Sequence, residues 1–176
     1  VGNFDIGKGY QMGTVSGGTQ ILQFTGTIAT ADQLQAVINN HGNGSGRRWN
    51  LVANPFPSYL MLNDDTHATN NLLTANTAII DGAYLAAYGY DADGSGFTAY
   101  GQDYNSNNTP VYVAPGQAFM IAASSSSSAN LSFTEAMLTT TGSDDFINND
   151  NMDNSEVYIK LYNDDQIIET THIKFQ

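Results

Sequence analysis

The segment 91–96 carries the best candidate for ligand chemistry in this sequence. Asp91, Asp93 and Ser95 place oxygen atoms at its first, third and fifth positions, and a glycine follows at the sixth. This spacing resembles the first half of a calcium-binding loop. The second half of that pattern is missing, because the twelfth position is Gln102 instead of a bidentate Glu. Two interpretations stay open: a calcium site, or an ordinary Asp- and Gly-rich turn between two strands.

Three tyrosines, Tyr84, Tyr88 and Tyr90, form the second candidate site. Their even spacing places them on one face of a strand. Exposed rings stack on the C–H faces of sugars, and nearby Asn and Asp side chains bond sugar hydroxyls, so this face would bind carbohydrate. The alternative is that the rings of the chain are buried and form its core.

Catalytic groups do not assemble into a recognisable pattern. The chain has no cysteine, which excludes a thiol nucleophile, a disulfide framework and Cys-ligated metals. Its histidines are scattered, and nothing points to the pair of facing carboxylates that a glycosidase needs. We therefore expect no enzymatic activity and no cofactor other than calcium. The residues concerned are His41, His67 and His172, with the glutamates Glu135, Glu156 and Glu169.

The charge balance narrows the classes of partner. Seventeen acidic residues against five basic ones give a net charge of −12. Such a surface repels phosphate backbones and anionic lipids, which argues against nucleic acid and the membrane surface. The longest apolar run, 118–123, is far shorter than the roughly 20 residues of a membrane helix, so we expect no membrane insertion. Only 12% of residues are charged, which is typical of a β-rich extracellular domain with many turns.

An internal repeat predicts the architecture. The segment from Gly7 to Phe24 and the segment from Gly116 to Phe133 share a Gly, a following ring, a polar turn and a Leu-x-Phe-Thr ending, without a gap. Each is predicted to be a hairpin. The core candidates are the rings Tyr10, Phe24, Trp49, Phe119 and Phe133.

The rest of the chain also favours strands. We expect a strand over 48–53 that ends at the prolines 55 and 57, and a hairpin over 83–100. Residues 31–38 fit both helical and strand spacing, and we favour a strand. The predicted fold is all-β: an antiparallel β-sandwich of jelly-roll type, with two similar hairpins and at most one short helix.

These predicted elements divide the chain into three regions. Residues 1–138 form the sandwich core with its hairpin repeat. Residues 139–156 form a loop rich in Asn and Asp. Residues 157–176 alternate between apolar and polar positions and form a C-terminal hairpin, which completes the sandwich or joins the next domain. Because the chain starts at Val1 and stops within an alternating stretch, we expect it to be a segment of a longer protein.

One motif connects these segments to a known family. Residues 49–58 read Trp-Asn-Leu-Val-Ala-Asn-Pro-Phe-Pro-Ser, which closely resembles the W-N-L-[VI]-[GA]-N-P-[YF]-P-S motif of secreted surface proteins of Bacteroidetes that are exported by the type IX secretion system. The sequence departs from the commoner form at Ala53, where Gly is usual. Further matching segments lie in the same order, at Gly7–Tyr10, Phe24–Gly26, Ala114–Phe119, Phe133–Thr134 and, one residue longer here, Glu169–Phe175.

The resemblance implies an extracellular β-sandwich module at the cell surface, and it implies no activity. We therefore expect a non-catalytic structural or adhesive module whose partners are neighbouring domains or subunits. Strand exchange with neighbours would assemble such modules into a filament. The alternative is a carbohydrate-binding module that uses its aromatic face on a surface polysaccharide.

The calcium interpretation makes a direct prediction. An excess of chelator should lower the melting temperature, because an ion bound only to the folded chain stabilises it. The double variant Asp91→Ala, Asp93→Ala should lose that response. Differential scanning fluorimetry with and without EDTA measures both, and identical melting curves would leave only the ordinary turn.

Overall fold

The chain forms an all-β structure of two packed layers. The computed structural model describes residues 3–11, 26–27, 29–37, 45–63, 69–91, 96–101, 110–124, 129–140, 156–163 and 166–174. In these residues the single α-helix is α1 (Leu72–Ala75), and the 3-10 turns are η2 (Ser45–Arg48), η4 (Gly82–Tyr84) and η6 (Glu135–Met137). None of the described helices is long and apolar enough to cross a membrane. The predicted all-β, sandwich-like fold is therefore confirmed.

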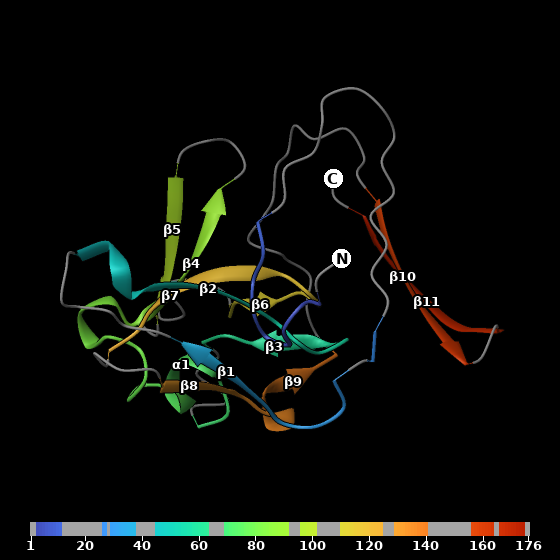
Figure 1. Ribbon diagram of the computed structural model, residues 1–176, viewed down its shortest axis with the longest axis horizontal. Coiled ribbons are helices and arrows are strands. Elements are labelled where there is room, and N and C mark those ends of the chain that lie inside the picture. The colour runs from blue at the N-terminus through green and yellow to red at the C-terminus, as the bar shows by residue number, and fades with distance from the viewer. Residues whose placement is uncertain are drawn as a thin grey trace.

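One layer is a four-stranded antiparallel sheet, and the other combines two smaller sheets (Figure 1). The four-stranded sheet has the order β2 (Trp49–Ala53), β7 (Ala118–Ala122), β4 (Ala86–Asp91), β5 (Gly96–Gly101). The smaller sheets have the orders β6 (Tyr112–Val113), β3 (Tyr59–Met61), β9 (Leu138–Thr139), and β1 (Gln33–Val37), β8 (Ala129–Phe133). Every described strand pair is antiparallel.

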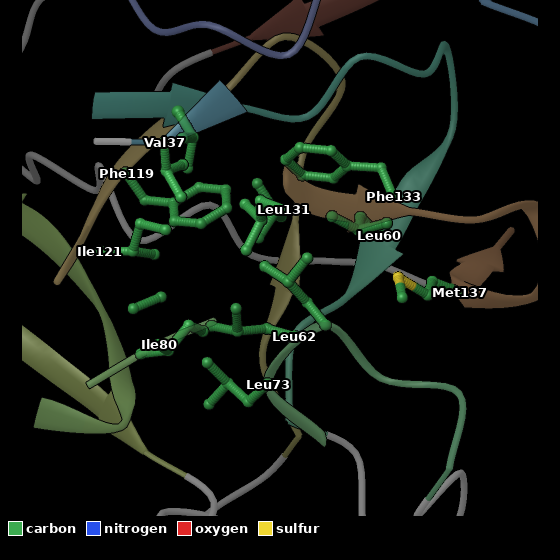
Figure 2. Packing of buried hydrophobic residues seen from close by; sticks show 14 of the residues in the cluster. Val37, Leu60, Leu62, Leu73, Ile80, Phe119, Ile121, Leu131, Phe133 and Met137 are labelled. Atoms are coloured by element: carbon green, nitrogen blue, oxygen red, sulfur yellow. The ribbon is translucent and has the colours of Figure 1, made fainter. Parts of the chain in front are cut away.

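The core fills the space between the layers (Figure 2). Phe119 and Ile121 of β7 point toward Leu131 and Phe133 of β8, and all four are at most 1% exposed. Alternate residues of a strand face opposite sides, so each of these strands gives its large side chains to the core at every second position. Leu60, Leu62, Leu72, Leu73, Ile80 and Met137 complete the fully buried set together with Val37 and Val52.

The repeat at 116–133 forms two strands, as predicted, but these strands do not make a hairpin. β7 pairs with β2 and β4, whereas β8 pairs with β1. The chain therefore crosses from one layer to the other between them. The physical reason is burial: both strands carry rings that are fully buried, and strands in facing layers can bury them against each other. Most of the first repeat, including Phe24, lies outside the described residues.

Two local predictions are confirmed. Residues 33–37 form a strand, β1, which is paired along its whole length with β8. β4 and β5 form a hairpin in which Asp91 opposes Gly96 as the last pair. Gly96 has a φ of 119°, a conformation that an L side chain rarely adopts, which explains the glycine at this place.

The C-terminal hairpin is also confirmed. β10 (Glu156–Asn163) pairs with β11 (Gln166–Lys174) from Glu156↔Lys174 to Asn163↔Gln166, with a register shift between Leu161 and Tyr162. Among the described strands, neither of the two pairs with any other strand. In Figure 1 they lie to one side of the two layers.

Asn54 links the end of β2 to two other segments. Its side-chain amide donates to the carbonyl oxygens of Ser58, Val113 and Ala114 at 2.8, 3.0 and 3.2 Å, and its Oδ1 accepts from the Phe56 N–H at 3.0 Å. The side chain is only 2% exposed. A buried amide is costly unless it is hydrogen-bonded, and here both ends of the amide have partners.

The segment 114–117 closes this network from the opposite side. Gln117 N–H donates to the Ala114 carbonyl at 3.0 Å, and Gly116 between them has a φ of 72°, as a type II turn requires after a proline. The Asn54 backbone donates to the Gln117 carbonyl at 3.0 Å and accepts from the Gly116 N–H at 3.2 Å. The two motifs that carry the family resemblance, 49–58 and 114–119, are thus bonded directly to each other.

Replacing Asn54 tests how much the fold depends on this amide. Asn54→Ala removes the acceptor of the Phe56 N–H and one donor from each of the Ser58 and Val113 carbonyls, whereas the Ala114 carbonyl keeps the Gln117 N–H. We expect a loss of about 3 kcal/mol or more of unfolding free energy, at roughly 1–3 kcal/mol for each unsatisfied group.

Urea unfolding followed by circular dichroism measures this loss. The matched control is Asn130→Ala, which removes an exposed asparagine of β8 and should stay within about 0.5 kcal/mol of the parent. A similar small change in both variants would show that the amide network does not stabilise the fold.

Candidate functional site: an aromatic stripe on the outer face

The four-stranded sheet has one buried face and one outer face. Val52, Phe119 and Ala87 face the core and are at most 1% exposed. The opposite face carries alanines and, between them, larger side chains that are not fully covered. These outer residues are Trp49 and Leu51 of β2, Met120 of β7, Tyr88 and Tyr90 of β4, and Phe97 of β5.

Trp49 is the centre of the first ring cluster. Its ring meets the ring of Tyr88 edge-on, with centroids 4.8 Å apart, and that of Tyr84 at 5.6 Å. Tyr84 belongs to the turn η4 and not to β4, yet it reaches the same face. Ala122, which lies directly opposite Trp49 in the register, is fully buried although it is on the outer face. The ring cluster therefore lies over Ala122 and shields this end of the outer face from solvent.

Tyr90 and Phe97 form the second ring cluster. They are opposite each other in the β4–β5 hairpin, and their ring centroids are 5.2 Å apart. Both rings reach solvent, with exposed fractions of 54% and 58%. Two adjacent exposed rings on one sheet face make this pair a candidate contact surface.

The two clusters lie on one diagonal of the sheet. Trp49 sits in the row of Ala122, Tyr88 in the row of Met120, and Tyr90 two residues further along β4. The row of Tyr90 and Phe97 continues into the small residues Ala118 and Ala53, whereas Tyr88 lies between Ala99 and the larger Met120. We call the rings Tyr84, Trp49, Tyr88, Tyr90 and Phe97 the aromatic stripe.

An ion pair holds the end of the stripe in place. Arg48 Nη1 donates to Asp81 Oδ2 at 2.6 Å, and both side chains are less than one-fifth exposed. The other oxygen of Asp81 accepts from the Ala83 N–H at 3.0 Å and so caps η4. The guanidinium of Arg48 lies 5.1 Å from the centre of the Tyr84 ring, within the range of a cation–π contact. Tyr84 is thus fixed both by its turn and by its neighbour.

The hydroxyl of Tyr88 is affected by its surroundings. Burial, and secondly the neighbouring Tyr84, raise the pKa of Tyr88 above its ordinary value. The hydroxyl of Tyr88 therefore resists ionisation to a higher pH than that of an ordinary tyrosine.

The structure brings together the three tyrosines that the sequence singled out and adds two residues. Trp49 was expected in the core, but it is half-buried on the outer face. Val52, three positions further along the same strand, faces the core, so Trp49 must face the opposite side. Phe97 was not selected from the sequence. The available signal was the predicted hairpin, because Phe97 near the start of the second strand lies opposite Tyr90 near the end of the first.

The proposed calcium ligands are not tested by the described residues. Asp91 ends β4 directly beyond the Tyr90–Phe97 pair, whereas Asp93 and Ser95 lie outside the described residues. Within the described part of the chain, no three His, Cys, Asp or Glu residues come close enough to hold a metal ion. Calcium binding stays a prediction.

Comparison with known proteins found no matching family model, no matching curated protein and no matching solved structure.

The ion pair beneath the stripe gives a testable prediction. Asp81→Asn removes the charge but keeps an oxygen for the Ala83 N–H, and it should lower the unfolding free energy by about 1–2 kcal/mol because the pair is shielded from water. The emission of Trp49, the sole tryptophan of the chain, should shift to longer wavelength as η4 loosens.

The control is Asp5→Asn, which breaks the exposed pair between Lys8 and Asp5 at 3.3 Å. That pair is solvated, so neither stability nor emission should change measurably. Equal responses in the two variants would show that Arg48 and Asp81 do not position the cluster.

Proposed function

We propose that this chain is a non-catalytic structural and adhesive module of a secreted cell-surface protein, and that the aromatic stripe is its contact surface. The observation that carries the proposal is the exposure of Tyr84, Tyr90 and Phe97 at 40%, 54% and 58% on one sheet face. Rings that are both exposed and held in fixed positions lose little freedom when a partner binds, which is what an adhesive surface needs.

The motif resemblance supports the structural part of the proposal. Asn54 and Gly116, from the two most specific segments, make hydrogen bonds to each other within the fold. Phe56 from the same motif is 2% exposed and belongs to the core. The motif residues therefore have a structural explanation that requires no reaction. Export by the type IX secretion system and a place outside the cell follow from the resemblance and remain part of the proposal.

Assembly into filaments by strand exchange is the second element of the proposal. Segment 7–9 lies along one edge of the four-stranded sheet, where Gly9 donates to the Leu51 carbonyl at 3.0 Å and Ala53 donates to the Gly7 carbonyl at 3.0 Å. The opposite edge is β5, which pairs only with β4 among the described strands. A strand from a neighbouring subunit would add at that edge.

Carbohydrate binding is the second candidate function, and a specific observation favours it. Tyr84 and Tyr88 pack edge-to-face against Trp49, and Tyr90, on the same face, packs edge-to-face against Phe97. An adhesive module that attaches to a surface polysaccharide would satisfy both descriptions.

Two measurements on the purified chain test the proposal. Retention is measured on insoluble neutral and acidic polysaccharides and on surfaces coated with the chain itself, and soluble reducing sugars are measured in the same samples. Electron microscopy of the chain shows whether it forms fibres. We expect retention without release of sugars, and fibres if strand exchange operates. Release of sugars would contradict a non-catalytic module, and a monomer that no surface retains would contradict adhesion.

A further inference from the structure

We propose, on the basis of the adhesive function above, that the aromatic stripe binds an uncharged polysaccharide chain lying diagonally across both ring clusters. The cluster of Trp49, Tyr84 and Tyr88 would stack one part of the chain, and Tyr90 with Phe97 would stack the next. Trp49 and Phe97 are thereby assigned as binding residues alongside the three tyrosines.

The geometry of the sheet sets the length of the ligand. Trp49 is on the first strand and Phe97 on the last strand of the order β2-β7-β4-β5, and their rows are four residues apart along β4. With ordinary strand spacing and rise, the two rings are about 20 Å apart along the diagonal. A single sugar is too short to reach from one cluster to the other, so the site is suited to a polymer and not to a monosaccharide.

The shape of the face favours a chain that lies flat. Between the clusters the neighbouring positions are Ala99, which is exposed, and Ala118, which is partly covered. These alanines leave Tyr90 and Phe97 raised above the sheet, and Met120 lies beside Tyr88, so a ligand that rests on both clusters also passes over Met120. The Arg48–Asp81 pair already fixes the first cluster, so binding does not have to order it.

The net charge of the chain favours an uncharged polymer over a charged ligand on the stripe. The chain has a net charge of −12, so acidic polysaccharides are repelled. In the assembly proposed above, a second copy of the chain adds at the β5 edge and does not occupy the rings. A basic protein is attracted to the acidic surface as a whole. The stripe itself offers rings and the guanidinium of Arg48, and none of its five ring residues carries a carboxylate to pair with a cation. A neutral sugar surface needs only the rings and the hydroxyls of the tyrosines.

The test uses the full chain and neutral oligosaccharides of increasing length, with glucan and mannan series and with alginate as the acidic probe. Because Trp49 is the sole tryptophan, its fluorescence reports directly on the first cluster during titration. We expect affinity for a neutral series to rise with length until both clusters are covered. Tyr84→Ala and Phe97→Ala should each weaken binding of the long oligosaccharide about tenfold.

The double variant Tyr90→Ala, Phe97→Ala separates the two clusters. It should bind short oligosaccharides with the affinity of the parent, but its affinity should not rise further for longer oligosaccharides. The control is Leu34→Ala, which removes the most exposed large hydrophobic side chain, 65% exposed, from β1 in the other layer. This control should bind like the parent. Unchanged circular dichroism spectra establish that each variant is folded, and the rings replaced are exposed enough for this to be expected.

Several outcomes would overturn the inference. Binding that does not depend on length, variants of the stripe that bind like the parent, or a preference for alginate would each contradict it. If the stripe variants lose adhesion to surfaces but the parent binds no neutral oligosaccharide, the inference fails and the proposed contact surface stands. If the variants adhere to surfaces as the parent does, the inference and the stripe as contact surface both fail. If the parent binds no oligosaccharide and no surface retains it, the adhesive function itself is wrong.

Discussion

The satisfied amide of Asn54 is the interaction on which the rest of the structure depends. It is buried, and it bonds the carbonyls of Ser58, Val113 and Ala114 while accepting from the Phe56 N–H. The same solution recurs in a chain without disulfides: Asn76 bonds Ser132 through both its amide groups, and Asn63 joins Gly101 to Val111. Neutral amides make these cross-links without burying a charge, which suits a chain in which only 12% of residues are charged.

The four-stranded sheet is stabilised by its inner face, so the outer face can carry exposed rings without loss of the core. The inner face of β7 presents Phe119 and Ile121 to the core, and it is these residues that stabilise the sheet. The outer face adds rings whose packing is edge-to-face and whose end is held by Arg48 and Asp81. The same four strands therefore stabilise the fold on one side and present rings on the other, the side that we propose as the contact surface. This division explains how a chain can display Tyr90 and Phe97 to water and still have a complete core.

The sequence predicted local structure well and long-range pairing poorly. Local signals identified the strands β1, β2 and β4–β5: the prolines end β2, an Asp- and Gly-rich turn joins β4 to β5, and the spacing in residues 31–38, which also fits a helix, includes the alternation of a strand. It did not show that β7 and β8 belong to different layers, since a strand, a polar turn and a strand describe both a hairpin and a crossing. For the site, parity placed Tyr88 and Tyr90 together. Trp49 was assigned to the core because large rings usually are buried, and only the register with β7 shows which face it occupies.

The central claim is that the aromatic stripe, and no other exposed apolar surface, is where this module meets its ligand. Intermolecular NOE spectroscopy on the isotope-labelled parent chain with a long neutral oligosaccharide tests it most directly, because it reports which protein protons lie against bound sugar. The account predicts transfer between the sugar and the ring protons of Tyr84, Tyr90 and Phe97. Transfer from the exposed Phe4 or Leu34 instead, with none from the stripe, would contradict it.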